Sequence, residues 1–262
     1  MPISITKRAK LPYTIDDTDA FYIVRQSVKL MASSVTAIAE SETSGSNRLR
    51  IDGMVSGDSY AVPTLDLAGR DTALVIGRKG YVGTSGEVAV RFAGEGQSFV
   101  NHGKVDGVVD LGDAATLASF ENNGLIEGTL RLGASTFELV LGKDSELDGR
   151  RWGYGITRDA AEGVATTTVN LGEIDATHAF SSVGGNETFI NRGTVKGDIE
   201  LRGGNDTFQQ MNGTFYDEVH GGSGDDTYII GNFRGEIVEE AGGGNDTVRA
   251  KFEFYMDYDA EI

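Results

Sequence analysis

Four acidic residues recur at a nearly constant spacing toward the end of the chain, each within a glycine-rich stretch. In the segments GGNETF, GGNDTF, GSGDDTY and GGNDTV they are Glu187, Asp206, Asp226 and Asp246. In a stacked fold this spacing places the carboxylates in one column, where neighbours about 5 Å apart repel each other by roughly 1 kcal/mol. A hard cation between successive turns removes that repulsion. Calcium suits such a column because it takes about six to eight oxygen ligands, and glycine turns can supply carbonyls.

We therefore expect a calcium site between each pair of successive carboxylates, completed by glycine carbonyls. The expected ligands are Glu187, Gly204, Asp206, Gly222, Gly224, Asp226, Gly244 and Asp246. The site between Asp206 and Asp226 is expected to be the best, because two aspartates face each other across complete glycine turns. The alternative interpretation is that each aspartate closes its turn by an Asx-type hydrogen bond, without metal.

A second repeat, with a similar period, indicates which elements position the column. The frame Asn-x-Gly-x-Val/Ile begins at Asn101, Asn122, Asn170 and Asn191, with a degenerate copy at 143–149 and an early copy at 51–62. Apolar residues two apart are typical of strands, and frequent glycines exclude a long helix. Such coils must stack to bury their apolar faces. The sequence predicts an all-β fold, a right-handed parallel β-solenoid of the β-helix or β-roll type, with coils of about 20–21 residues.

The frame also predicts which side chains stack. Strands are expected near 105–111, 126–132 and 195–201. One apolar column is expected to contain Val105, Ile126, Leu147, Ile174 and Val195. The asparagines are expected to form a hydrogen-bonded ladder, the first two and the last two stacked on each other.

Three regions follow from where the repeats hold. Residues 1–50 show no repeat and are expected to form an irregular N-terminal cap. Residues 51–181 are expected to form the solenoid, with an insertion at about 150–168. Residues 182–262 are expected to form calcium-binding coils continuous with it. Since the chain ends soon after a predicted calcium turn, we expect it to be truncated there, as the N-terminal portion of something longer.

The segment GGSGDDTYI, residues 221–229, resembles the nonapeptide of RTX (hemolysin-type calcium-binding) proteins, Gly-Gly-x-Gly-x-Asp-x-apolar-x, at every defined position. The segments AGGGNDTVR, LRGGNDTFQ and SVGGNETFI depart from it increasingly. The resemblance implies that Asp226 is a calcium ligand and that Tyr228 points into the core. Because the motif recurs once per coil, only one edge of the solenoid is expected to hold calcium. The resemblance also implies export through a type I system and folding outside the cell.

Composition agrees with an extracellular protein that binds cations. The 40 acidic and 23 basic residues give a net charge of −17, which disfavours nucleic acid and anionic membranes as partners and favours divalent cations. The sequence lacks cysteine, an apolar N-terminal signal and any apolar run long enough to span a bilayer. We expect an extracellular or cell-surface location.

The sequence favours a structural or adhesive module over an enzyme, because the repeats are regular and no catalytic constellation is found. One alternative is a β-helix polysaccharide lyase or epimerase, for which Arg131, Asp148 and Arg151 are the best candidates. Another is a module that binds a polysaccharide or cell-surface glycan through the bulge around Trp152. That bulge also contains Arg150, Arg151, Tyr154 and Arg158. The ligand and the oligomeric state stay open.

Overall fold

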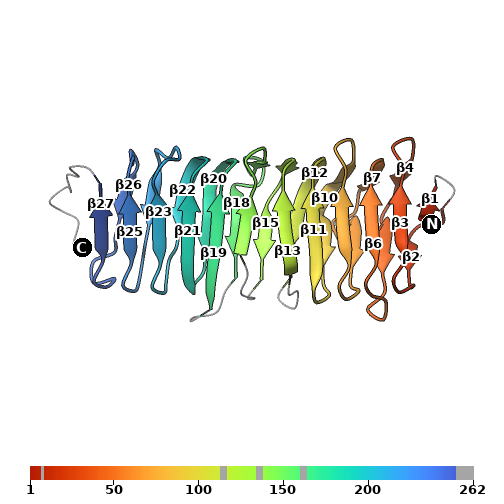
Figure 1. Ribbon diagram of the computed structural model, residues 1–262, viewed down its shortest axis with the longest axis horizontal. Coiled ribbons are helices and arrows are strands. Elements are labelled where there is room, and N and C mark those ends of the chain that lie inside the picture. The colour runs from red at the N-terminus through yellow and green to blue at the C-terminus, as the bar shows by residue number, and fades with distance from the viewer. Residues whose placement is uncertain (7–8, 113–116, 134–137, 160–163, 252–262) are drawn as a thin grey trace. The chain divides into compact units, whose positions relative to one another are not determined.

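The computed structural model describes residues 1–6, 9–112, 117–133, 138–159 and 164–251, and every regular element within them is a β-strand (Figure 1). The chain divides into two compact units, Met1–Gly133 and Ala134–Ile262. Over the described ranges, the chain contains no apolar helix of membrane-spanning length.

In the first unit, the chain alternates between two parallel sheets as it winds. The first sheet has the order β1 (Ile3–Ile5), β3 (Phe21–Val24), β6 (Arg48–Ile51), β9 (Ala73–Ile76), β11 (Gln97–Asn101) and β13 (Leu117–Asn122). The second has the order β2 (Tyr13–Ile15), β5 (Ile38–Glu40), β8 (Leu65–Leu67), β10 (Tyr81–Phe92), β12 (Lys104–Asp110) and β14 (Leu125–Glu127). Beside these, β4 (Lys29–Met31) pairs with β7 (Met54–Gly57), β7 with β10, and β15 (Leu130–Leu132) with β12.

The second unit repeats this arrangement. Its first sheet has the order β16 (Glu138–Leu141), β19 (Ala165–Asn170), β21 (Asn186–Asn191), β23 (Thr207–Gln210), β25 (Thr227–Ile230) and β27 (Thr247–Ala250). Its second sheet has the order β17 (Glu146–Asp148), β20 (Glu173–Ser182), β22 (Thr194–Glu200), β24 (Glu218–His220) and β26 (Glu236–Val238), and β18 (Tyr154–Arg158) also pairs with β20. Each strand is parallel to the strand one coil away, which confirms the predicted parallel β-solenoid.

The apolar column predicted from the frame is present in both units. Val105 pairs with Ile126 in the first unit, and Ile174 pairs with both Leu147 and Val195 in the second. All five side chains are fully buried. Aromatic rings join the two sheets across the core, as where Phe92 and Phe99 lie 5.6 Å apart, because inward-facing residues of both sheets share one narrow interior.

Residues 1–50 differ from the predicted irregular cap, because they already belong to stacked coils. Strands β1, β3 and β6 pair in parallel, as do β2, β5 and β8. Here, however, each coil is longer than the repeat of the frame. Neighbouring strands of the first sheet pair in succession at Val24, Ile51, Ile76, Asn101 and Asn122. The number of residues between neighbouring members of this series is larger at the start of the unit than at its end. The extra residues lie in loops such as 32–37 and 58–64, so the early coils do not show the period of the later ones.

The asparagines form the predicted ladder within each unit. Asn101 Nδ2 donates to Asn122 Oδ1 at 2.8 Å, and Asn170 Nδ2 donates to Asn191 Oδ1 at 3.0 Å. All four side chains are fully buried. The second ladder continues one coil further than the frame predicts, since Asn191 Nδ2 donates to Gln210 Oε1 at 2.7 Å.

Each ladder amide also holds its own turn, which explains the glycine two positions after it. Gly103 N–H donates to Asn101 Oδ1 at 3.0 Å. A Cβ on Gly103 would lie 2.4 Å from the carbonyl oxygens of Gly77 and Gly80 in the preceding coil. The frame Asn-x-Gly therefore requires glycine because this turn packs directly against the turn of the preceding coil.

Replacing Asn122 by Ala is expected to lower the free energy of unfolding by about 1 kcal/mol or more, because the buried amide of Asn101 loses the nearer of its two acceptors and keeps only the carbonyl of Leu125 at 3.3 Å. Urea unfolding measures this change. The matched control is Asn123→Ala, which removes an amide from the same turn that is only partly buried, and it is expected to be close to neutral. Equal effects of the two substitutions would contradict the ladder's role in stability.

Candidate metal centre

The acidic residues meet where four strands of the second unit begin: Glu187 is the second residue of β21, and the three aspartates directly precede β23, β25 and β27. Thr188, Thr207, Thr227 and Thr247 are paired in succession along the first sheet. The residue before each threonine therefore falls in one column, at successive coils about 4.8 Å apart. These residues are Glu187, Asp206, Asp226 and Asp246. The column predicted from the spacing thus exists.

One oxygen of each aspartate is used in a hydrogen bond between coils. Asp206 Oδ1 accepts from Glu187 N–H at 2.7 Å, Asp226 Oδ1 from Asp206 N–H at 2.7 Å, and Asp246 Oδ1 from Asp226 N–H at 2.9 Å. The metal-free alternative placed such bonds within a turn, whereas these run from one coil to the next. They hold the carboxylates in register and leave the second oxygen of each aspartate for another partner.

Three second oxygens of the column are buried without hydrogen-bond partners among the described residues. They are Glu187 Oε2, Asp206 Oδ2 and Asp226 Oδ2. Their residues are only 1%, 2% and 1% exposed, respectively. A buried acceptor without a partner destabilises the fold by about 1–3 kcal/mol, and more when it is charged. The column is therefore incomplete without a proton or a cation.

Burial raises the pKa of Asp206 to about 9. The hydrogen bond from Glu187 N–H lowers this pKa, whereas the negative charges of Glu187 and Asp226 raise it further. Burial likewise raises the pKa of Asp226 to about 7, with contributions from the charges of Glu239, Asp246 and Asp225. Both shifts favour the neutral form of the carboxyl group. A bound divalent cation would reverse this preference, because it stabilises the ionised form.

Three carboxylates converge at the C-terminal end of the column. Oxygens of Asp226, Glu239 and Asp246 all lie within 4.8 Å of one another. Tyr228 donates its hydroxyl hydrogen to Glu239 Oε1, and Gly222 N–H donates to Glu239 Oε2 at 3.3 Å. Burial raises the pKa of Glu239 above its ordinary value. These oxygens are of the kind and spacing that one hard cation can bridge.

Glu239 was not among the predicted ligands, because it lies outside the period of the acidic repeat. It directly follows β26 and therefore enters the column from the other sheet. The only sequence signal for it is the acidic pair Glu239–Glu240, between an apolar strand and the glycines of the last turn. A Cβ on Gly221 would lie 2.4 Å from Asp226 Oδ2 and 2.5 Å from Glu239 Oε1. This crowding explains the first glycine of the nonapeptide.

The other end of the column already contains a cation. Arg158 Nε lies 3.3 Å from Glu187 Oε1, and both side chains are 1% exposed. Ser182 also donates its hydroxyl to Glu187 Oε1 at 2.9 Å. Burial lowers the pKa of Arg158, and the charge of Glu187 partly offsets this. The sequence groups Arg158 with the bulge around Trp152, but Arg158 ends β18 and its buried side chain pairs with Glu187 of the column.

The predicted glycine ligands occupy the expected turns. Gly204, Gly222 and Gly224 have φ angles of 117°, 98° and 124°, in a region that favours glycine. A Cβ on Gly224 would lie 1.9 Å from the carbonyl oxygen of Gly204, and one on Gly244 2.0 Å from that of Gly224. The carbonyls of Gly204 and Gly224 thus face the next coil, where the sequence predicts that they act as ligands.

The bulge around Trp152 is mostly occupied by internal contacts. Arg151 lies over the Trp152 ring at 5.2 Å from its centroid, and Arg150 pairs with Asp148 at 2.6 Å. Tyr154 stacks on His178 with ring centroids 5.0 Å apart. Residues 160–163 of the predicted insertion lie outside the described residues. Because Arg150 and Arg151 already contact other residues of the chain, little of the bulge's positive charge is free to bind a ligand.

The residues suggested as catalytic for a polysaccharide lyase or epimerase also have internal partners. Arg131, in the first unit, forms an ion pair with Glu87 at 2.6 Å and lies 3.4 Å from Asp110. Asp148 and Arg151 belong to the second unit, where Asp148 is bound by Arg150. The geometry adds nothing that favours catalysis by these residues.

No protein-family model, curated protein or solved structure matches the chain. The class of the protein is therefore defined by the fold and the column alone. It is a parallel β-solenoid whose last coils bury carboxylates on one side.

Raising the pH is expected to destabilise the second unit when no cation is supplied. The pKa of Asp206 rises from 3.8 to about 9 on folding, so above pH 3.8 the unfolded chain loses a proton that the folded chain keeps. The stabilisation from this proton is complete below pH 3.8 and is lost as the pH rises through about 9. Urea unfolding in EGTA at several pH values measures it.

The isosteric variant Asp206→Asn serves as the comparison, since its side-chain oxygen can still accept from Glu187 N–H. It is expected to show a flatter pH profile than the wild type and to be the more stable of the two at high pH. Identical profiles for the two proteins would contradict the raised pKa of Asp206.

Proposed function

We propose that this chain is a calcium-binding structural or adhesive module, whose C-terminal coils are stiffened by calcium. The observation that carries the proposal is the convergence of Asp226, Glu239 and Asp246 within 4.8 Å, in a column that also buries unpartnered carboxylate oxygens. A divalent cation would neutralise the charge and give those oxygens a ligand bond. The resemblance of residues 221–229 to the RTX nonapeptide supports the same metal.

The donor set favours calcium over other metals. It contains carboxylate and carbonyl oxygens only, and the chain has no cysteine. Hard oxygen donors suit calcium, manganese and magnesium, whereas zinc and copper prefer nitrogen and sulfur. Magnesium requires near-octahedral geometry at about 2.0–2.1 Å, but calcium accepts irregular shells at about 2.3–2.6 Å. Ligands that come from separate coils and two sheets fit the more tolerant ion.

The geometry favours a different order of calcium affinity among the proposed sites. The sequence favours the site between Asp206 and Asp226, but Glu239 supplies a third carboxylate between Asp226 and Asp246. We therefore place the strongest site at this last pair. The site at Glu187 is the weakest, because the guanidinium of Arg158 already neutralises that end.

A module of this kind fits a protein that is secreted or displayed on the cell surface. With its column unneutralised, the second unit is destabilised by its own carboxylates. Calcium binding supplies free energy to folding, so the unit would order where calcium is abundant. Export in the unfolded state through a type I system, implied by the RTX resemblance, is consistent with such a switch.

Chelation is expected to loosen the last coils, while the coils of the ladder formed by Asn101 and Asn122 stay folded. At a calcium concentration about 100 times the Kd, binding adds about 2.7 kcal/mol of stability. Hydrogen exchange with calcium or EGTA measures this residue by residue. Protection around Asp226 is expected to fall in EGTA, and protection around Asn101 is expected to stay unchanged. Equal protection near Asp226 in both conditions would rule out the calcium hypothesis.

Substitution of single carboxylates separates the site from general charge effects. Asp226→Asn is expected to abolish the calcium response at the last pair. The matched control is Asp225→Asn, which removes one charge from an exposed neighbour whose Oδ1 only accepts from Asn245 N–H. The control is expected to keep the calcium response. Loss of the response in both variants would point to diffuse electrostatic binding.

A further inference from the structure

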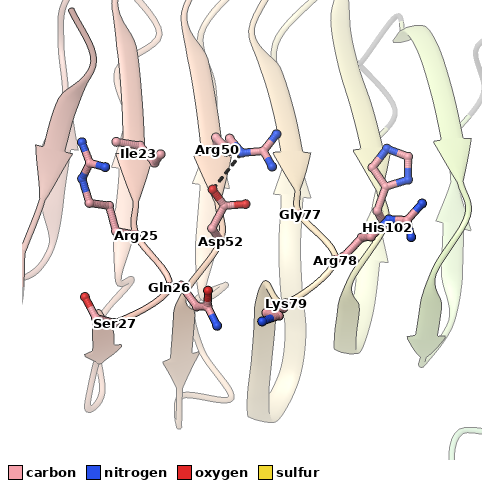
Figure 2. A pocket seen from close by; sticks show the side chains of 10 residues that line it. All are labelled: Ile23, Arg25, Gln26, Ser27, Arg50, Asp52, Gly77, Arg78, Lys79 and His102. Carbon is pink, nitrogen blue, oxygen red and sulfur yellow. Dashed lines mark hydrogen bonds and ion pairs between the residues drawn. The ribbon is translucent and has the colours of Figure 1, made fainter.

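A shallow pocket opens where the chain of the first unit passes from one sheet to the other. Its volume is about 810 Å³, and its lining comes from the ends of β3 and β6, the turns after β3, β6 and β9, and the residue after β11 (Figure 2). Of the three turns, the middle one is the shortest, as the paired residues that bound them show: Val24 to Leu30, Ile51 to Val55, and Ile76 to Val82. The short turn after β6 is thus flanked by two longer turns.

The two longer turns are hydrogen-bonded reversals that carry basic residues. Val28 N–H donates to Arg25 O at 2.8 Å, and Gly80 N–H donates to Gly77 O at 2.7 Å. The first reversal begins at Arg25, and the second has Arg78 and Lys79 at its two central positions. The longer turns are thus the ones that bring most of the charge to the pocket.

The pocket is strongly positive in a strongly negative protein. Arg25, Arg50, Arg78 and Lys79 line it with a single carboxylate, that of Asp52, so four positive charges less one negative charge leave +3, against −17 for the chain. Arg50 Nε pairs with that carboxylate at 2.8 Å. His102 adds an imidazole at the edge of the same surface (Figure 2).

Basic residues on the neighbouring sheet surface are paired, and those of the pocket are largely not. Arg91 pairs with Asp66 at 2.6 Å, and Lys104 pairs with Glu127. Among the described residues, Arg78 and Lys79 form no ion pair, and the side chain of Arg25 reaches only the Ser4 hydroxyl, at 3.3 Å. Like charges that converge on one hollow repel each other, and a bound anion would relieve that repulsion.

We propose that this pocket binds the acidic groups of a polysaccharide, carboxylates or sulfates carried on successive sugar units. Arginine side chains suit such planar or multi-oxygen anions, because the guanidinium presents parallel N–H donors. Coils about 4.8 Å apart place the turns of Arg25 and Arg78 roughly 10 Å from each other, so the donors are spread along a line. The open, polar shape fits a hydrated, extended chain.

The overall charge argues for this ligand over a denser polyanion. Nucleic acid carries about one negative charge per 1.7 Å of duplex axis and would be repelled by the acidic surface beyond the pocket. A polysaccharide with one acidic group per sugar has a lower charge density and can place a few groups in the pocket. The site lies within the first unit and does not depend on the proposed calcium centre.

Binding can be measured by calorimetry at low salt in EGTA, with an oligouronate and a sulfated oligosaccharide as probes. Inorganic sulfate and single-stranded DNA are the comparison ligands. Wild-type protein is expected to bind at least one of the two sugars more tightly than either comparison ligand, and less tightly as salt increases. No binding of either sugar, or tighter binding of free sulfate or DNA, would overturn the proposal.

Variants locate the site. Arg78→Ala with Lys79→Ala is expected to weaken sugar binding by about tenfold or more, because charge-assisted hydrogen bonds are lost. Asp52→Asn removes the one carboxylate found among the described residues that line the pocket, and it is expected to strengthen binding. The control Lys143→Ala with Arg192→Ala removes the same charge from exposed positions of the second unit and is expected to leave binding unchanged. An equal loss in the control would assign the binding to general electrostatics and overturn the proposed site.

Discussion

The structure depends on the stacking of equivalent positions about 4.8 Å apart along parallel strands. Whatever group occupies a position in one coil meets the corresponding group of the next. Apolar side chains are stabilised by this arrangement because each packs on the next, as Ile174 packs between Leu147 and Val195. Buried amides gain as well, because each has both a donor and an acceptor and can bond to its neighbour. Carboxylates do not, since they have only acceptors and repel one another.

In the acidic column, stacking leaves carboxylate oxygens without hydrogen-bond partners. The two ends of the column differ in how their negative charge is balanced. At one end Arg158 reaches from β18 into the column and pairs with Glu187. At the other end a third carboxylate, Glu239, is added to Asp226 and Asp246, which increases the negative charge. A built-in cation suits a permanent structural contact. An excess of oxygens suits an external cation, and this contrast supports placing calcium at the C-terminal end.

Features that repeat could be predicted from the sequence, and features that occur once could not. The frame predicted the paired Val105 and Ile126 and the ladder of Asn101 and Asn122, because stacking requires the same residue type at each coil. The longer coils at the start of the chain went unseen, since a loop can grow without disturbing the strands. The positions of Arg158 and Glu239 in the column were not predicted either, because each residue enters the column from outside its period.

Calcium titration with measured proton release tests the central claim most directly. Burial raises the pKa of Asp206 to about 9 and that of Asp226 to about 7, so without metal Asp206 holds a proton near neutral pH and Asp226 is partly protonated. Calorimetry in two buffers of different ionisation enthalpy would report how many protons leave when calcium binds. The account predicts release near neutral pH, and calcium affinity that rises with pH. Binding without proton release, or no binding at millimolar calcium, would contradict it.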